Sequence, residues 1–252
     1  MKDISAIVIA KNAKDLIGDC LDSLSFCDEI IVIDGGSEDK TLEIAEKKKA
    51  KIFNHEMQDF SKSRNYGLEK AQGKWVLYVD VDERITPELA KNIREAIKGS
   101  NSEISAYKLL RKNYYLGKNE WPYIEKLERL FLKEKLNGWE GKLHETASVD
   151  GKIGQLDGFL LHYTHRDLSS MVNKTIEWSK TEAELRFNSN HPKMTWWRFP
   201  RVMLTAFLNS YVKQKGYKAG VVGVIESVYQ AFSMFITYAR LWEMQKQKEL
   251  KK

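Results

Sequence analysis

The sequence predicts an α/β protein with a mostly parallel sheet flanked by helices, followed by a C-terminal helical extension. In residues 1–99, short apolar runs alternate with segments of helical periodicity, which is the pattern of parallel strands joined by helices. Residues 104–164 hold strand-like runs separated by glycines. From about residue 167 the periodicity is helical again. We therefore expect an α/β half at 1–99, a β-rich half of the same domain at 100–166, and a helical extension at 167–252.

The first half contains four apolar runs that predict buried strands, because they are rich in β-branched residues. Between them, apolar residues recur three and four positions apart, as one buried face of a helix requires. Thr86-Pro87-Glu88 predicts a helix start, with a capping threonine, a proline at the first helical position and an acid near the positive end of the helix dipole. The expected strands are 5–10, 29–33, 51–53 and 75–79, and the expected helices include 16–24, 42–45, 61–71 and 89–97.

The β-rich half and the helical extension differ in their periodicity. Strands are expected at 107–116, 127–133, 147–149 and 159–164. The extension contains several tryptophans and then an apolar stretch from Val221 to Trp242, which carries Glu226 and Arg240. Because these charges interrupt it, no uninterrupted run is long enough to predict a clear transmembrane helix.

Composition is that of a soluble protein with a basic surface. The 252 residues are 42% hydrophobic and 30% charged, with a formal net charge of +6. This balance favours anionic partners such as nucleotides, nucleic acid or an acidic membrane face. Cys20 and Cys27 do not have the number or spacing of a disulfide framework or a metal site, which fits a reducing compartment. The first apolar run is too short for a signal peptide.

Two acids end the fourth strand. Asp80 and Asp82 lie two residues apart, so an extended backbone would point both carboxylates to the same side. In open α/β sheets, ligands bind at the carboxyl ends of the strands. Close carboxylates repel each other unless a cation or proton shares the site. A hard divalent ion with a phosphate on its far side would resolve the repulsion, although the two acids could also simply begin a loop.

Two further turns belong to the same predicted edge. Asp34 ends the second strand and is followed by Gly35-Gly36-Ser37, a glycine-rich turn of the kind that contacts nucleotides. Arg64 lies near the start of a helix, where a guanidinium can reach a diphosphate or stack on a base. The fingerprints G-x-G-x-x-G and G-K-[ST] are absent from the sequence. Each turn alone is ordinary, but in a parallel sheet all of them share one edge.

These segments resemble the successive blocks of family 2 glycosyltransferases, which have the GT-A fold. The resemblance rests on Ile7-Val-Ile-Ala-Lys-Asn12, Val32-Ile-Asp-Gly-Gly-Ser-Glu-Asp39, Arg64-Asn-Tyr-Gly-Leu68 and Tyr78-Val-Asp-Val-Asp-Glu-Arg84, in that order. Shorter motifs, Leu143-His-Glu145 and Tyr238-Ala-Arg-Leu-Trp-Glu243, resemble the bacterial lipopolysaccharide-core β-glucosyltransferase branch of that family. The resemblance implies a GT-A-like sheet that transfers a hexose, most simply glucose, from a UDP-sugar to a lipopolysaccharide core or lipid-linked glycan.

The resemblance also implies roles for individual residues. In such an enzyme Asp34 contacts the uracil or ribose, Arg64 lies by the nucleotide, and Asp80 faces ribose or metal. Asp82 ligates Mg²⁺ or Mn²⁺ bridging the diphosphate. The donor site implied in this way consists of Ala10, Asn12, Asp34, Arg64 and Asp80.

Sugar transfer also needs a carboxylate that takes a proton from the acceptor hydroxyl. Glu145 is the first candidate for this base, although His144-Glu145 departs from the Glu-Asp pair usual in the family, and Glu128 is the alternative. A single direct displacement would invert the anomeric centre. His162 is either a further metal ligand or a hydrogen-bonded core histidine.

The helical extension combines basic, aromatic and apolar residues, which favours contact with a membrane surface. A helical bundle that covers the sheet or forms a dimer is the alternative. We therefore expect a cytoplasmic enzyme, peripheral on the inner membrane face, with a UDP-sugar donor, a glycan or lipid-linked acceptor and no nucleic-acid partner. Two other functions stay open from the sequence: a nucleotidyltransferase on a similar sheet, and a basic non-enzymatic protein that binds nucleic acid or membrane.

Overall fold

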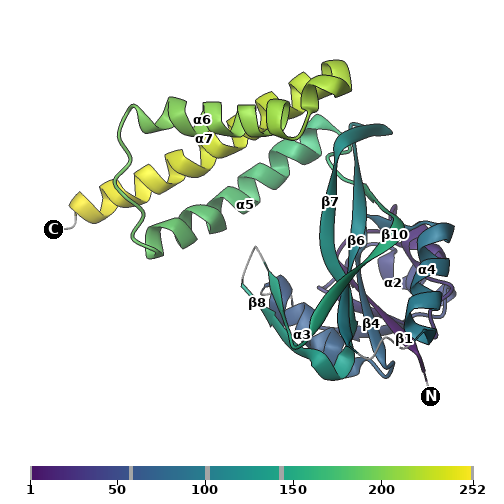
Figure 1. Ribbon diagram of the computed structural model, residues 1–252. Helices are drawn as coiled ribbons and strands as arrows, with labels where there is room; N and C mark the ends of the chain where they lie inside the picture. The colour runs from purple at the N-terminus through teal and green to yellow at the C-terminus, as the bar shows by residue number, and fades with distance from the viewer. Residues whose placement is uncertain (1, 57–58, 100–102, 142–144, 251–252) are drawn as a thin grey trace. The chain divides into compact units, whose positions relative to one another are not determined.

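The computed structural model describes residues 2–56, 59–99, 103–141 and 145–250. The chain divides into two compact units, whose elements are labelled in Figure 1. The sheet unit comprises Met1–Lys112 and Glu125–His162, and the helical unit comprises Asn113–Ile124 and Tyr163–Lys252. The second boundary lies close to the one expected at 166. The segment Asn113–Ile124, in contrast, belongs with the helices, because Trp121 packs on Gly216 and its Nε1 donates to Gln214 Oε1 at 3.2 Å.

The described residues form an eight-stranded sheet in the order β3-β2-β1-β4-β7-β6-β10-β5 and a two-stranded sheet of β8 and β9. Strands β3, β2, β1 and β4 are parallel, whereas β7 is antiparallel to β4 and β5 is antiparallel to β10. The first five strands are β1 (Ile4–Ala10), β2 (Glu29–Asp34), β3 (Lys51–Asn54), β4 (Trp75–Asp80) and β5 (Glu83–Ile85). The others are β6 (Ile104–Tyr115), β7 (Asn119–Leu132), β8 (Leu136–Glu140), β9 (Thr146–Val149) and β10 (Lys152–Tyr163).

Helices cover both faces of the sheet, as the alternating pattern predicts. The alternate residues of β1 belong to two separate cores, since successive side chains point to opposite faces. One core contains residues of α1 (Ile17–Ser23), α2 (Thr41–Lys47) and α4 (Pro87–Lys98). The other contains residues of β8 and of α3 (Phe60–Lys70). The α/β fold class with flanking helices is therefore confirmed.

Local signals explain where the helices begin. Thr86 caps α4 by accepting from the backbone N–H of Leu89, with Pro87 at the first position, as expected. Asp59 caps α3 in the same way by accepting from Lys62 N at 2.8 Å. Strands β5 and β8 were not expected, because their sequences, ERI and LNGWE, are not runs of β-branched apolar residues.

The helical unit contains α5 (Leu168–Asn188), α6 (Arg198–Leu208) and the 31-residue α7 (Gly220–Leu250). A π-helical turn, η2 (Asn209–Lys213), and a 3₁₀ turn, η3 (Gly216–Ala219), connect α6 to α7. Among the described residues, one helical stretch, Gly216–Leu250, is long and apolar enough to cross a membrane, and only 28% of its most apolar part is buried. The apolar run itself is interrupted by Glu226 and Arg240, as the sequence shows, but the helix continues through both residues.

Both cysteines are free thiols. Cys20 on α1 is buried, and Cys27 in the following loop is partly buried. Burial raises the pKa of each thiol far above its usual value.

Candidate functional site

The carboxyl ends of the parallel strands bring the predicted donor residues together. Ala10 at the end of β1 is in register with Asp34 at the end of β2, and Ile9 is in register with Asp80 at the end of β4. Three positions that lie far apart in the sequence therefore share one edge of the sheet. This is the arrangement expected from three successive strand-to-helix turns.

Asp34 organises the loop that follows it. Its side chain is buried, and its carboxylate accepts from Gly36 N at 2.9 Å and from Ser37 N and Oγ at 3.0 and 2.5 Å. The same loop is tied to the end of β1, because Asn12 N donates to Ser37 Oγ at 2.9 Å and Asn12 Oδ1 accepts from Glu38 N at 2.8 Å. Asp34 thus fixes the shape of the edge, and its contact with a nucleotide stays a prediction.

Helix α3 carries Arg64 to the same edge. The helix lies close to the sheet at Gly67, where a Cβ atom would come within 2.5 Å of Ile7. Arg64 is buried, with its guanidinium 4.8 Å from the ring centre of Trp139, and its Nη2 donates to Asp80 Oδ1 at 2.9 Å. Close helix packing and stacking therefore fix one cation beside the end of β4.

Asp80 is paired on both oxygens. Arg129 Nη2 on β7 donates to its Oδ2 at 2.6 Å, while Arg64 holds Oδ1. Burial opposes ionisation of Asp80, but the guanidinium groups of Arg129 and Arg64 outweigh it and hold the pKa of the carboxyl well below its usual range. The charge expected to require a metal ion or a proton is therefore balanced by two arginines.

Asp82 lies in the turn between β4 and β5, so the expectation of an extended backbone through it is wrong. Its Oδ2 lies 3.2 Å from Nε2 of His162 on β10. The pairing of β10 with β5 places His162 opposite Glu83, one residue beyond Asp82. Asp80 and Asp82 consequently have different partners, and the repulsion between them does not decide what binds.

A buried network supports this edge from below. Glu83 is fully buried and accepts from the backbone N–H of Asp80 at 2.9 Å. Its other oxygen accepts from Arg129 and Arg111, each at 3.0 Å, and Arg111 also pairs with Glu125 at 2.5 Å. Hydrogen-bonded ionised groups rigidify a site where they are satisfied. Both oxygens of Glu83 are satisfied in this way, whereas Nε of Arg129 has no hydrogen-bond partner among the described residues.

The two candidate bases have different surroundings. Oε1 of Glu145 lies 3.9 Å from Nε of Arg64, so this carboxylate borders the Arg64–Asp80 pair. Glu128 is one residue from Arg129 on β7, and successive side chains on a strand point to opposite faces. Glu128 accordingly pairs with Lys108 at 3.5 Å rather than with the Asp80 cluster. The neighbouring His144 lies outside the described residues.

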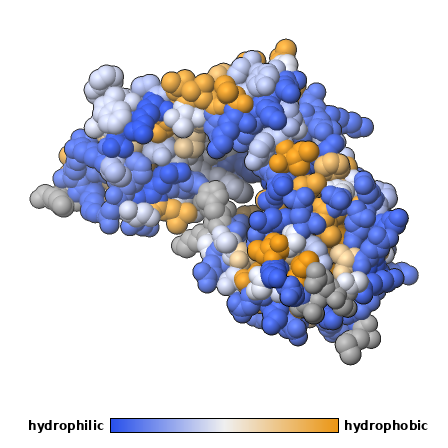
Figure 2. Space-filling view, viewed as in Figure 1, coloured by the Kyte–Doolittle hydropathy of each residue, from blue (hydrophilic) through white to orange (hydrophobic). Residues whose placement is uncertain are grey.

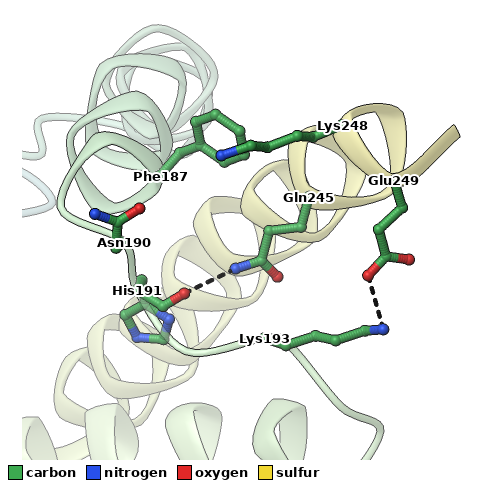
Figure 3. Close-up of a pocket in the computed structure, with 7 residues that line it drawn as sticks. All are labelled: Phe187, Asn190, His191, Lys193, Gln245, Lys248 and Glu249. Atoms are coloured by element: carbon green, nitrogen blue, oxygen red, sulfur yellow. Dashed lines mark hydrogen bonds and ion pairs between the residues drawn. The ribbon is translucent and has the colours of Figure 1, made fainter. Parts of the chain in front are cut away.

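A small pocket of about 230 Å³ lies in the helical unit (Figure 3). It is lined by Phe187, Asn190, His191, Lys193, Gln245, Lys248 and Glu249. Lys193 crosses it to pair with Glu249 at 2.7 Å, and Gln245 donates to the His191 carbonyl at 3.1 Å. None of the predicted site residues lines this pocket.

Residues 5–150, more than half of the chain, match the sequence profile of glycosyl transferase family 2. The chain belongs to this family. The match contains Asp34, Arg64, Asp80, Asp82 and Glu145, and therefore almost all of the edge described above. The nucleotidyltransferase and the non-enzymatic protein considered from the sequence are set aside by this membership.

The similarity of this family 2 glycosyltransferase to individual relatives covers more of the chain than residues 5–150. It is 24% identical to LpsC of Rhizobium meliloti (strain 1021), a lipopolysaccharide core biosynthesis glycosyltransferase, over 253 residues that span 95% of this chain and 92% of LpsC. An uncharacterized glycosyltransferase of Rickettsia typhi is 27% identical over 259 residues, spanning 97% and 88% of the two chains. Activity in the synthesis of lipopolysaccharide or related glycans is consistent with these relatives.

The solved mannosyltransferase PcManGT from Pyrobaculum calidifontis, in complex with GDP-Man and Mn²⁺, has a similar fold. Its TM-score is 0.57 at 14% identity, over 96% of this chain and 90% of that chain. The likeness confirms the GT-A fold that the sequence blocks predict.

The residues of the edge fit a divalent ion only in part. A cluster of three or more His, Cys, Asp or Glu side chains that could hold a metal is absent from the described residues. Asp82 and His162 do offer a carboxylate oxygen and an imidazole nitrogen 3.2 Å apart. Mg²⁺ and related ions often take one or two protein ligands and complete their coordination with phosphate oxygens and water. Asp82 with His162 therefore fits such an ion, whereas both oxygens of Asp80 already accept from arginines.

Sequence reasoning missed Arg129, Glu83 and Arg111. These residues contact one another only because distant strands pair in the sheet, and no local sequence pattern reveals that pairing. The available signal was two charged residues, Arg111 and Arg129, within strands of otherwise partly apolar character. A buried arginine in a predicted strand requires a buried acid as its partner.

Proposed function

We propose that this family 2 glycosyltransferase transfers a hexose, with glucose as the first candidate, from a UDP-sugar to a lipopolysaccharide core or a related lipid-linked glycan. One observation carries the proposal: the Asp34 loop, the Arg64–Asp80 pair, the Asp82–His162 pair and Glu145 belong to one connected edge of the sheet. The relationship to LpsC supports the choice of acceptor class.

In this proposal one set of residues binds the donor and stabilises its leaving group, and another residue activates the acceptor. Ala10, Asn12 and Asp34 border the nucleoside, and Arg64 stands beside the diphosphate. Asp82, together with His162, would hold Mg²⁺ or Mn²⁺, which when bound stabilises the negative charge of the departing diphosphate. Arg129 and Glu83 keep Asp80 and the turn after it in place.

Glu145 takes the proton of the acceptor hydroxyl. As that proton leaves, the acceptor oxygen forms a bond to the anomeric carbon while the bond from that carbon to the diphosphate oxygen breaks. The nucleoside diphosphate departs with the bonding electrons, and a single displacement inverts the anomeric centre. The 3.9 Å distance between Glu145 and Arg64 supports Glu145 over Glu128 as the base, because it puts a carboxylate beside the donor residues.

The lipid-linked acceptor implies that the enzyme works in the cytoplasm at the inner membrane face. The basic and aromatic helices of the helical unit fit that location.

A panel of radiolabelled nucleotide sugars with truncated core acceptors tests the donor and acceptor together. We expect transfer from UDP-glucose in the presence of Mn²⁺ or Mg²⁺, and thermal stabilisation by UDP plus Mn²⁺ but not by ATP or duplex DNA. Transfer from GDP-mannose alone would replace the UDP-hexose assignment. Transfer from no donor to any glycan would contradict the acceptor class.

A further inference from the structure

The solvent-facing side of α7 is apolar. Between Val221 and Trp242 every exposed side chain is hydrophobic, and these residues recur at the three- and four-residue spacing of one helical stripe. Val221 is 75% exposed and Val228 is 54% exposed. The stripe consists of Val221, Val224, Ile225, Val228, Phe232, Phe235 and Trp242. In a water-soluble helix the polar residues would occupy this side.

The buried side of α7 carries the polar residues instead. Glu226, Ser227 and Thr237 are at most 4% exposed. Oε2 of Glu226 lies 3.0 Å from Nδ1 of His165, and Tyr229 Oη donates to the Met171 carbonyl at 2.7 Å. Because these polar groups have their partners inside the helical unit, α7 cannot rotate to bury its apolar stripe.

Helix α6 and the π-helical turn continue the apolar surface. Leu204, Leu208 and Val212 follow one another at intervals of four residues and are between 46% and 59% exposed. Phe199 of α6 lies 5.9 Å from Phe235 of α7, so the two helices are neighbours. Figure 2 shows a patch of apolar residues along the upper side of the helical unit. A connected apolar surface of this kind marks a docking face.

Basic and aromatic residues accompany this face. Residues 196–220 contain five lysines or arginines and no acid. Trp197 lies beneath the guanidinium of Arg198 at 5.0 Å, and the adjacent Trp196 is 83% exposed. The basic residues are Arg198, Arg201, Lys213, Lys215 and Lys218.

We propose that this docking face, formed by α6, η2 and the stripe of α7, lies in the plane of an anionic lipid surface. Amphipathic helices with lysine, arginine and tryptophan next to an apolar stripe bind the boundary between headgroups and acyl chains. A second copy of the chain fits less well, because it would bring the same five positive charges against each other. An in-plane position, rather than a membrane span, follows from the packing of the polar side of α7 on α5 and His165. The inference rests on the proposed function only in that a lipid-linked acceptor gives the enzyme a reason to work at a membrane.

Flotation of the full-length protein with lipid vesicles tests the proposal. We expect the fraction of protein that floats to be about fivefold or more higher with vesicles that contain phosphatidylglycerol than with vesicles of pure phosphatidylcholine. High salt should reduce this fraction, because it screens the charges. Phe232→Ser/Phe235→Ser should lose flotation on both compositions. The matched control Ile153→Ser changes an exposed apolar residue of the sheet unit and should float like the wild type.

Charge is tested separately. Lys213→Ala/Lys218→Ala should lose most of the preference for phosphatidylglycerol, whereas Lys91→Ala/Lys98→Ala, which removes two exposed charges from α4, should keep it. Thermal stabilisation by UDP plus Mn²⁺ is measured on every variant, so that loss of membrane binding is separated from loss of the donor site.

Three results would overturn the proposal. One is equal flotation with neutral and anionic vesicles, and another is wild-type flotation by the Phe232/Phe235 variant. The third is a dimer in solution that the same variant dissociates, because it would assign the face to a second copy.

Discussion

The two units of this glycosyltransferase place their apolar and polar residues in opposite ways. In the sheet unit, apolar side chains fill two cores, and the buried charges lie in paired positions such as the network around Asp80 and Glu83. In the helical unit, α7 turns Glu226 and Ser227 inward and its valines and phenylalanines outward. A hydrophobic residue therefore has a different meaning in each unit: it stabilises the fold of the first and forms the outer surface of the second.

The largest expected effect concerns the edge of the sheet unit. Asp82→Ala should reduce transfer about a thousandfold or more, because it removes the carboxylate that fits the divalent ion, while circular dichroism and thermal stability stay near wild type. Asp157→Ala, an exposed acid on β10, is the matched control and should retain activity. Full turnover of the Asp82 variant in excess chelator would remove the metal assignment.

The buried network of the sheet unit should be sensitive to loss of one charge. Arg129→Ala leaves Asp80 and Glu83 short of a cation, and removing one partner of a buried ion pair costs about 3 kcal/mol or more of unfolding free energy. Urea denaturation measures this loss. Arg94→Ala breaks a partly exposed pair with Asp28 and should cost at most about 1 kcal/mol. Equal losses in the two variants would mean that the network has no special role.

The base assignment gives a smaller effect on rate. Glu145→Gln keeps the size of the side chain but removes its ability to take a proton, so kcat should fall about a hundredfold while donor affinity is retained. Glu128→Gln should leave kcat nearly unchanged, since Glu128 pairs with Lys108 instead. An unchanged kcat for Glu145→Gln, with a loss for Glu128→Gln, would transfer the role to Glu128.

The smallest expected effect tests the contrast between the units directly. Val221→Ser in α7 should change the unfolding free energy in detergent-free solution by less than about 0.5 kcal/mol, because that side chain is 75% exposed. Phe131→Ser in β7 should cost about 3 kcal/mol or more, because that ring is fully buried. Comparable losses in both variants, measured by urea denaturation, would mean that the outer side of α7 is packed against protein.

The fold could be predicted from the sequence wherever the hydrophobic pattern was long and regular. The alternation in residues 1–99 and the Thr86-Pro87 start of α4 gave the parallel strands and their helices. Two features had no local signal. β5 has two charged residues out of three, and the grouping of Asn113–Ile124 with the helices depends on Trp121 packing on Gly216, about a hundred positions later.

In the candidate site, only the residues at the carboxyl ends of the strands could be predicted. Strand-end acids and glycines identified Asp34, Asp80 and Asp82, because their positions follow from where strands end. The pairing of those acids could not be predicted in this way, because it depends on strand register. Arg129 was missed altogether, and His162 was named as a candidate ligand without its contact to Asp82 being foreseen. For Asp80 the structure adds two arginines that balance its charge, a source of positive charge that the sequence did not predict.

The protonated state of the two native thiols has a practical consequence. A thiolate is the species that reacts with maleimides, and burial disfavours it at Cys20 and Cys27. A cysteine added on the outer side of α7 should consequently accept a fluorophore or spin label over a silent background. Such a probe would report immersion depth on vesicles without any prior removal of the natural cysteines.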